Sequence, residues 1–422
     1  MINIQTIREN ADLVIERLNI KNFDAKEIVK QILDIDAERR NVQKEVDGLK
    51  ADLNKISKEI GQLFKSGKGA EANALKAKVG ENKDNIKNLD AKFAELAEKQ
   101  DSLLLQLPNI PCYDVPEGKT PDDNKVVRSS GEIKSNEGML PHWELAEKYD
   151  LIDFELGNKI TGAGFPVYKG KGARLQRALL NFFLDENTEA GYQETQPPIL
   201  VNEASAYGTG QLPDKEGQMY HATGDNLYLI PTAEVPLTNI FRDVLLNEKD
   251  LPIKITGYTP CFRREAGSYG KDVRGLNRLH QFDKVEILQV QHPDKSYDAL
   301  EDMVNHVEGI LKKLQLPYRI LALCGGDMSF TSAFTYDFEV FSEAQERWLE
   351  VSSVSNFESY QANRLKLRFK SAEGKNQLAH TLNGSSLAFP RIMASILENY
   401  QTADGIEIPE VLKPYCGFDK IS

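Results

Sequence analysis

Apolar side chains recur at steps of three and four residues between about residues 27 and 100. Steps of this kind place one apolar seam along a left-handed coiled coil. The first run comprises Ile35, Val42, Val46, Leu49, Leu53, Ile56, Ile60 and Leu63. The second run comprises Leu75, Val79, Ile86, Leu89, Phe93 and Leu96, with Asn82 at the one vacant seam position. Because Ser66-Gly67-Lys68-Gly69 separates the two runs, the pattern predicts an antiparallel helical hairpin.

Beyond this hairpin, helical and strand-like patterns are mixed. Helical patterns cover about residues 142–153, 171–190, 297–314, 341–347 and 391–401. Strand-like runs cover Leu227–Ile230, Ile253–Phe262, Gln281–Gln291, Tyr318–Leu323, Thr335–Phe341, Leu349–Ser355 and Ala379–Asn383. The strands do not alternate strictly with helices. This order favours an α+β body, with a mainly antiparallel sheet flanked by helices, over a doubly wound fold.

A stretch rich in proline and turn-forming residues separates the two patterns. We therefore expect an N-terminal domain at residues 1–106, with its hairpin arm at about 27–100. A linker would cover residues 107–121, and the α+β domain would cover residues 122–422.

Charge is distributed unevenly along the chain. The 422 residues carry a net charge of −12, so the protein should not coat nucleic acid indiscriminately. Residues 50–78, around the expected tip of the hairpin, carry +4. On a lone coiled coil, such lysines would more often be a solvated face of a dimerisation or spacer segment. On an acidic protein, contact with a phosphate backbone is the sharper alternative.

Cysteine usage and hydropathy indicate a compartment. The four cysteines are too widely spaced for CxxC motifs, and the N-terminus lacks a secretory signal. The apolar runs are far shorter than the ~20 residues that cross a bilayer. We expect a cytoplasmic protein with no membrane partner.

The first candidate for chemistry is Phe262-Arg263-Arg264-Glu265, followed by Arg278-Leu279-His280-Gln281-Phe282 and Glu286. Arginine suits phosphate oxygens, glutamate accepts from an adenine amino group, and phenylalanine stacks on a base. The first four residues alone are more often a surface ion-pair ladder. The second segment weakens that alternative, since an exposed ladder needs no phenylalanine between arginines.

Two further segments carry candidate residues. The small residues of Asn383-Gly384-Ser385-Ser386-Leu387-Ala388 would clear a strand face for a flat ligand, and Arg391 would open the next helix. A simple turn before a packed helix is an equally good interpretation of that segment alone. Glu350-Val351-Ser352-Ser353 offers hard oxygen ligands that suit Mg²⁺ bound to phosphates. Thr232-Ala233-Glu234, like that tetrapeptide, is uninformative by itself.

Together these segments resemble the three signature motifs of class II aminoacyl-tRNA synthetases, and specifically the bacterial type of seryl-tRNA synthetase. Motif 1 is resembled by the segment Ala178–Glu189 with the following Pro197-Pro198. Motif 2 is resembled by Phe262–Glu286, and motif 3 by Asn383–Arg391. Gly208–Pro213, Thr232–Leu237 and Glu350–Ser353 are typical of the seryl enzyme. Ser386 and Ala388 stand where class II enzymes often have glycine, but both residues are small.

The resemblance implies an activity and its site residues. Serine and ATP would give seryl-adenylate and pyrophosphate, and the seryl group would pass to the 3′ end of serine tRNA. The implied catalytic residues are Arg263 and Arg391. The implied ATP site is Arg263, Arg264, Glu265, Arg278, Leu279, Phe282, Glu350, Val351, Ser352, Ser353 and Arg391. The implied serine site is Thr232, Ala233, Glu234, Arg263, Glu286, Asn383 and Ser385.

The resemblance also implies a cofactor and partners. Mg²⁺ would bind Glu350 and Ser353, and Pro198 would lie at the interface of a homodimer. The arm would bind serine tRNA, with its long variable arm, through Lys55, Lys58, Lys65 and Lys68. Selenocysteine tRNA would be a second substrate where it exists.

Two other functions remain open at this point. A paralogue could load an activated amino acid onto a carrier protein, although the basic arm would then have no purpose. A coiled-coil scaffold with a degenerate synthetase body would not need Arg263, Glu286 and Arg391 together.

Overall fold

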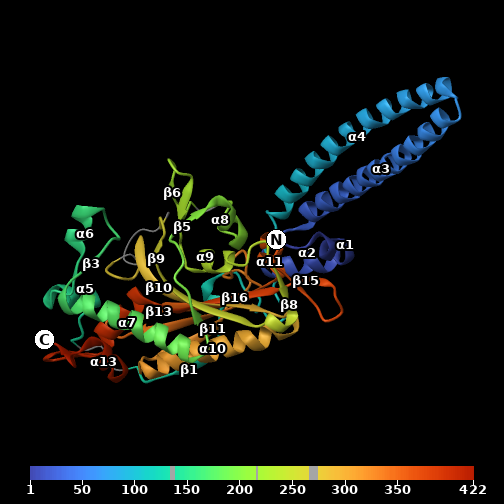
Figure 1. Cartoon of the computed structure of the whole chain (residues 1–422). Coiled ribbons are helices and arrows are strands. Elements are labelled where there is room, and N and C mark those ends of the chain that lie inside the picture. Colours follow the sequence, from blue (N-terminus) through green and yellow to red (C-terminus); the bar gives the residue numbers. More distant parts are fainter. Residues whose placement is uncertain (134–137, 215–216, 266–273) are drawn as a thin grey trace. The chain divides into compact units, whose positions relative to one another are not determined.

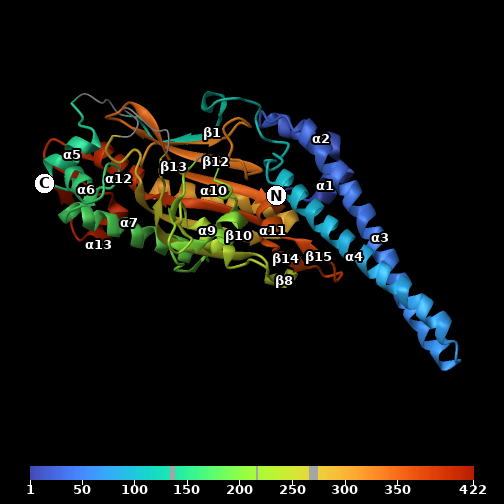
Figure 2. The same ribbon diagram turned by 90° about the horizontal axis from the view of Figure 1, so that it is seen from above.

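The computed structural model describes residues 1–133, 138–214, 217–265 and 274–422. The chain forms two compact units (Figures 1 and 2). One comprises Met1–Asn19 and Phe23–Pro108, and the other comprises Ile20–Asn22 and Asn109–Ser422. None of the helices in the described ranges is both long and apolar enough to span a bilayer.

The first unit is helical throughout. It contains α1 (Ile4–Glu9), α2 (Ala11–Ile20, whose last residue belongs to the second unit), α3 (Lys26–Lys65) and α4 (Gly69–Leu104). Helices α3 and α4 lie side by side in both views and are joined by a short turn (Figures 1 and 2). The predicted seam is confirmed, because Val42, Val46 and Ile56 of α3 are buried against α4. Asn82 is also buried, so a polar side chain does occupy the seam.

The base of the seam differs from the prediction. Asp36, rather than the neighbouring Ile35, is the fully buried residue there. Its carboxylate accepts hydrogen bonds from Arg8 Nε at 2.9 Å, Arg40 Nε at 2.9 Å and Gln100 Nε2 at 3.4 Å. Burial alone would raise the pKa of Asp36, but the bonds from Arg8 and Gln100 hold that pKa below its usual value. A buried carboxylate therefore fastens α1, α3 and α4 together.

The second unit is built on an eight-stranded sheet. In spatial order its strands are β1 (Lys125–Ser130), β11 (Tyr318–Ala322), β12 (Phe334–Ser342), β13 (Arg347–Glu358), β16 (His380–Ala388), β10 (Gln281–Gln291), β9 (Ile253–Phe262) and β4 (Gln193–Glu194). The pairings are antiparallel except for β4 with β9. With the helical arm, this sheet confirms the predicted fold class.

Short strands and helices surround the large sheet. One small sheet pairs β2 (Ile152–Asp153) with β3 (Val167–Tyr168), and a second has β7 (Leu227–Leu229) between β5 (Leu200–Asn202) and β6 (Tyr220–Ala222). A third has β14 (Arg368–Lys370) between β8 (Leu245–Asn247) and β15 (Asn376–Leu378). The fourth has β18 (Gly405–Glu407) between β17 (Gln401–Thr402) and β19 (Lys420–Ile421). The helices are α5 (His142–Lys148), α6 (Phe154–Ile160), α7 (Gly170–Glu189), α8 (Glu203–Thr209), α9 (Glu234–Asn239), α10 (Ser296–Lys313), α11 (Ser359–Leu365), α12 (Phe389–Asn399) and α13 (Lys413–Cys416).

The two faces of the large sheet serve different purposes. Helices α7 and α10 run along one face, where the main apolar core lies, and α8 and α9 lie on the other side (Figure 1). Alternate residues of β10 divide between the faces, since Val285 and Ile287 enter the main core while Lys284 and Glu286 point the opposite way. The sheet thus presents polar side chains on a rigid surface whose reverse is packed.

Two predicted helices differ from the structure. The segment 341–347 is a hairpin turn, because β12 ends at Ser342 and β13 begins at Arg347. Its residues favour helices locally, but they merely connect two paired strands, and Glu346 turns at a φ of 51°. The helix predicted over 142–153 ends at Lys148, and Asp150 adopts a φ of 50° before strand β2. Pairing with β3 outweighs helical propensity there.

Candidate active site

One cavity of about 460 Å³ opens on the polar face of the sheet. Its walls come from β10, β13, β16 and the start of α12, from Arg263 and Glu265 after β9 (Ile253–Phe262), and from residues 276–279 before β10. The sequence-predicted residues that line it are Thr232, Glu234, Arg263, Glu265, Arg278, Leu279, Phe282, Glu286, Glu350, Val351, Ser352, Ser353, Asn383, Ser385 and Arg391. Segments more than a hundred residues apart in sequence therefore meet in one place.

Strand register explains how these side chains meet. Glu286 of β10 lies directly opposite Ser385 of β16, and Asn383 of β16 lies opposite Ser355 of β13. Cross-strand partners project from the same face of an antiparallel sheet, so their side chains are neighbours. Ser386, the next residue along β16, points away and donates its hydroxyl to Asn187 Oδ1 at 2.8 Å. Its departure from glycine therefore leaves the cavity floor unchanged, while Ala388 contributes to that floor.

The buried Glu286 carboxylate is part of the cavity wall. Its Oε1 accepts hydrogen bonds from Thr232 Oγ1 at 2.7 Å and Ser385 Oγ at 3.4 Å. Lys284 forms an ion pair with the same carboxylate. Glu286 Oε2 is buried and has no hydrogen-bond partner within the described part of the chain. A buried, unpaired carboxylate oxygen at the end of a cavity is suited to a ligand that donates hydrogen bonds.

Lys284 was not recognised as a site residue from the sequence. A signal for it existed, because Lys284 and Glu286 are two residues apart on a strand and must share a face. Its buried ammonium group offsets the negative charge of Glu286. Gln361 was missed as well, and it lies on α11, outside every predicted motif.

Glu234 is the second carboxylate at this end of the cavity. Its Oε1 accepts a hydrogen bond from Gln361 Nε2 at 2.6 Å. Burial raises the pKa of Glu234 to about 7, and the negative charge of Glu286 acts in the same direction. Two carboxylates and one lysine leave this part of the cavity receptive to a cation. Ala233, which precedes Glu234, is buried but is not part of the cavity wall.

Arginines occupy the outer part of the cavity. The guanidinium of Arg263 lies 5.3 Å from the centre of the Phe282 ring, and its Nε donates to Pro231 O at 3.3 Å. Arg278 forms an ion pair with Glu265. Arg264 has its backbone N–H bonded to Gln218 O at 2.9 Å and lies outside the cavity wall. The predicted contacts of Arg264 and Ala233 with ligands stay predictions.

Arg391 and Glu350 meet at the mouth of the cavity. Arg391 Nη1 donates to the carbonyl oxygen of Glu350 at 2.7 Å and lies 3.6 Å from its carboxylate Oε2. The Glu350 side chain is half exposed, which leaves the carboxylate accessible from the cavity. Asp337 lies opposite Ser353 across β12 and β13, and burial together with the Glu350 charge raises the pKa of Asp337.

These oxygens fit a magnesium ion that is shared with phosphates. Among the described residues, no three His, Cys, Asp or Glu side chains form a complete metal site. Mg²⁺ bound to a nucleotide commonly takes only one or two protein oxygens and completes its shell with phosphates and water. Glu350 and Ser353 both line the cavity and supply such oxygens.

The residues predicted outside the cavity are accessible. Lys55, Lys58, Lys65 and Lys68 are all exposed near the turn that joins α3 to α4. Pro198 is exposed beside Ile199 and Leu200, two apolar residues that are 37% and 43% exposed.

Sequence comparisons identify relatives along the whole chain. Residues 1–111 match the family described as the seryl-tRNA synthetase N-terminal domain, and residues 218–400 match the class II tRNA synthetase core domain (G, H, P, S and T). A serine–tRNA ligase of Salinibacter ruber is 51% identical, over 100% of this chain and 99% of its own length. One from Akkermansia muciniphila is 48% identical over the same shares.

Solved structures agree with these relatives. The crystal structure of seryl-tRNA synthetase from Pyrococcus horikoshii complexed with ATP has a TM-score of 0.93 and 35% identity, and it covers 100% of this chain and 99% of that one. The cytoplasmic serine–tRNA ligase of Naegleria fowleri in complex with AMP has a TM-score of 0.89 at 27% identity, with the same coverage. Cavity, motifs, arm and full-length relatives agree, and the chain belongs to the seryl-tRNA synthetase family of class II aminoacyl-tRNA synthetases.

Proposed function

We propose that this cavity is where the chain, an ATP-dependent aminoacyl-tRNA ligase, joins serine to AMP before the seryl group is transferred to tRNA. One observation carries the proposal. Thr232 and Ser385 donate to one oxygen of Glu286, while its other oxygen is buried and has no hydrogen-bond partner among the described residues. That free acceptor suits the hydroxyl of serine, and the ammonium group of serine suits the nearby Glu234.

Serine-dependent exchange of pyrophosphate into ATP tests this proposal. Exchange should require serine, and addition of serine tRNA should give seryl-tRNA. An enzyme that loads a carrier protein would show exchange without charging of tRNA. A scaffold with a degenerate body would show neither reaction.

The mechanism requires charge neutralisation and alignment rather than a dedicated base. The serine carboxylate is itself the nucleophile, and it attacks the α-phosphorus of ATP as pyrophosphate leaves. Arg263 neutralises the carboxylate and the α-phosphate, which would otherwise repel each other. Positioning of the two reactants in line converts a bimolecular step into one within a single complex.

The outer cavity would hold ATP in a bent conformation. Phe282 and Arg391 would sandwich the adenine ring, and Glu265 would accept a hydrogen bond from its amino group. Arg278 and Arg391 would face the γ-phosphate. Glu265 and Arg278 already form an ion pair, so binding of ATP must redistribute their contacts.

Glu350 and Ser353 would hold Mg²⁺ beside the phosphates of ATP in this cavity. When bound, the ion would neutralise phosphate charge and so favour departure of pyrophosphate. Glu350 contributes a half-exposed carboxylate, and Ser353 contributes a hydroxyl beside it on β13.

A change of Glu350 to alanine should raise the Mg²⁺ concentration that pyrophosphate exchange requires. The substitution removes a proposed metal ligand and, with it, the long contact to Arg391. Exchange is measured against Mg²⁺ concentration, with Glu373→Ala, an exposed acid on a surface turn, as the control. An unchanged Mg²⁺ dependence in Glu350→Ala would place this residue away from the metal.

The KM for serine should rise as the pH falls below about 7. The pKa of Glu234 is about 7, so below that pH the carboxyl is protonated and no longer attracts the serine ammonium group. Above that pH the carboxylate is charged, and serine should bind more tightly. Exchange kinetics between pH 6 and pH 8.5, roughly one unit or more either side of that pKa, test this. In Glu234→Gln, the KM for serine should no longer change with pH over this range. If it still rises below pH 7, the dependence belongs to another group.

The remaining partners are proposals of the same kind. Arm residues 27–100 would bind the long variable arm of serine tRNA, and selenocysteine tRNA where it exists. A homodimer would form through the face around Pro198, where Ile199 and Leu200 are exposed. A cytoplasmic location agrees with the four cysteines, which form no disulfide with one another in the described part of the chain.

A further inference from the structure

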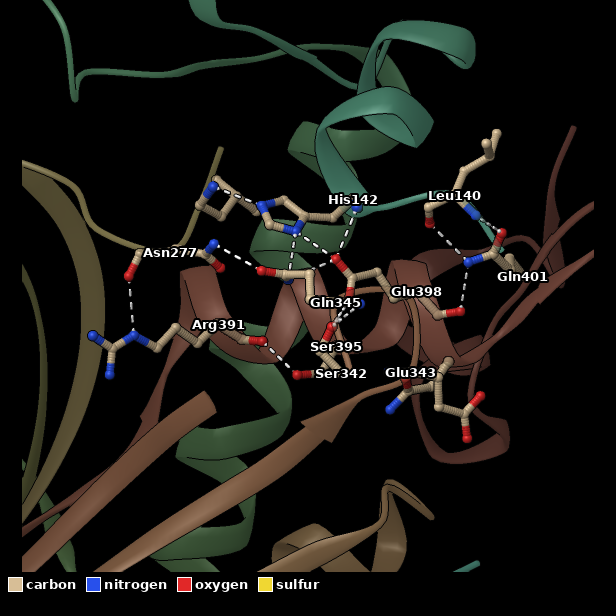
Figure 3. Close-up of polar contacts among 12 residues, drawn as sticks. Leu140, His142, Asn277, Ser342, Glu343, Gln345, Arg391, Ser395, Glu398 and Gln401 are labelled. Atoms are coloured by element: carbon tan, nitrogen blue, oxygen red, sulfur yellow. Dashed lines mark hydrogen bonds and ion pairs between the residues drawn. The ribbon is translucent and has the colours of Figure 1, made fainter. Parts of the chain in front are cut away.

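A fully buried carboxylate lies on α12, outside the wall of the cavity. Glu398 of α12 is 0% exposed, and its Oε1 accepts hydrogen bonds from His142 N at 2.9 Å, His142 Nδ1 at 2.7 Å and Gln345 Nε2 at 2.9 Å (Figure 3). Its other oxygen accepts from the hydroxyl of Ser342. Three polar residues, from α5, the end of β12 and the β12–β13 turn, therefore converge on one carboxylate in α12.

The first branch of this network runs through His142. The backbone N–H of Leu276 donates to His142 Nε2 at 2.8 Å, so Nε2 carries no proton. The imidazole is then neutral, with its proton on Nδ1 directed at Glu398. Gly275 permits this approach, because it has a φ of +65° and a Cβ there would lie 2.3 Å from His142 Nε2. The backbone at 275–276 is thereby fixed to Glu398.

The second branch runs through Gln345 and reaches the very next residue. Asn277 Nδ2 donates to Gln345 Oε1 at 2.9 Å, and the carbonyl oxygen of Asn277 accepts from Arg391 Nε at 3.1 Å (Figure 3). Arg391 Nη1 is held by the carbonyl oxygen of Glu350. Two fixed carbonyl oxygens thus set the plane of the Arg391 guanidinium, and its remaining N–H groups stay available to the cavity.

A stability role alone is a poor explanation for this arrangement. Burial of a charge is costly, and well-packed apolar side chains in its place are often neutral or stabilising. What an apolar cluster could not do is aim the Asn277 carbonyl at Arg391. Arg391 and Glu398 also lie seven residues apart on α12, so the helix that carries the guanidinium also carries the carboxylate that orients its acceptor.

We propose that Glu398, His142 and Gln345 are positioning residues, which act through Leu276 and Asn277 to hold Arg391 in the orientation that binds ATP. The inference rests on the proposed function, in which Arg391 contacts the nucleotide. None of the three residues lines the cavity, so each acts through others.

Kinetics of pyrophosphate exchange test the inference. Gln345→Met keeps the size of the side chain but removes the link between Glu398 and Asn277. It should lower kcat/KM for ATP by about 10- to 100-fold, the scale of a misplacement near 1 Å, and should leave the KM for serine unchanged. Ser342→Ala should give a smaller loss in the same parameter, and it serves if Gln345→Met does not fold. Tyr400→Phe is the control. It removes the hydrogen bond from Tyr400 Oη to Leu314 O near the same end of α12, and that bond is not part of the network that reaches Arg391.

A double-mutant cycle separates positioning from general damage. In an Arg391→Lys background, Gln345→Met should have little further effect, because the group that it positions is gone. The inference would be overturned if the losses in kcat/KM for ATP caused by Gln345→Met and Arg391→Lys multiplied in the double variant. It would also be overturned if Gln345→Met affected ATP and serine equally. A normal kcat/KM for ATP in Arg391→Lys alone would instead contradict the proposed role of Arg391, so the two failures are distinguishable.

Discussion

Glu286→Ala should lose most serine activation and should also narrow the preference for serine over alanine. The hydroxyl of serine would donate to the buried carboxylate, and hydrogen bonds to charged groups contribute about 1.5–3 kcal/mol. A site built around such a bond rejects the analogue that lacks the hydroxyl by ~10⁴-fold or more, because its polar groups are left unpaired. Activation of alanine should change little with the substitution. The ratio of kcat/KM for serine to kcat/KM for alanine should therefore shrink by roughly the same 1.5–3 kcal/mol.

Pyrophosphate exchange with both amino acids measures this effect. Glu286→Gln is the informative companion, since it keeps an acceptor oxygen for Thr232 but removes the charge that Lys284 neutralises. We expect Glu286→Gln to be intermediate in the ratio. If serine and alanine activation fall by one common factor, Glu286 shapes the cavity without recognising the hydroxyl.

Deletion of residues 27–100 should abolish tRNA charging while adenylate formation stays nearly intact. Every residue of the cavity lies outside the deleted segment. The four lysines proposed to contact tRNA lie within it, and so do both long helices almost entirely. Exchange without tRNA and charging with serine tRNA are the two measurements. Loss of exchange together with charging would show that the arm supports the catalytic unit itself.

Alanine at Lys55, Lys58, Lys65 and Lys68 tests the same surface without deleting it. Binding of tRNA should weaken, and its salt dependence should flatten by up to about one phosphate contact per lysine. Lys92 and Lys99 are matched controls, because both lie on the arm and already pair with Glu38 and Glu95. Equal salt slopes in the two sets of variants would exclude the arm tip as the phosphate-binding surface.

Long periodic segments were the most predictable part of this fold. Strands β9 and β10 begin and end where the sequence predicts, at 253–262 and 281–291, because each is a long strand-like run, with Pro252 before the first and Pro293 after the second. The turn at 343–346 was not predictable, because its helix-favouring residues are overruled by strand pairing across the sheet. Local sequence indicates the preferred secondary structure of a segment, but pairing within the sheet can override that preference.

The candidate site shows the same limit. Residues within recognisable segments, such as Glu286 and Arg391, were found, and the structure brings them to one cavity. Gln361 reaches Glu234 only through the fold, whereas Lys284 could be recognised only from its two-residue spacing to Glu286 on one strand. Asp36 is similar, because a carboxylate in a helical stretch is ordinarily a surface residue, and here Arg8, Arg40 and Gln100 compensate its burial.

The narrow seam of the arm has a consequence for its evolution. Most positions of α3 and α4 are exposed, and exchanges at such positions usually change stability by no more than about 0.5 kcal/mol. If the arm binds tRNA as proposed, its charge could therefore change together with that partner at little cost to folding stability. Changes in arm length are more restricted. Insertions matched in both helices preserve the seam most simply when they come in units of about seven residues, so lineages should differ in arm length by whole heptads more often than by single residues.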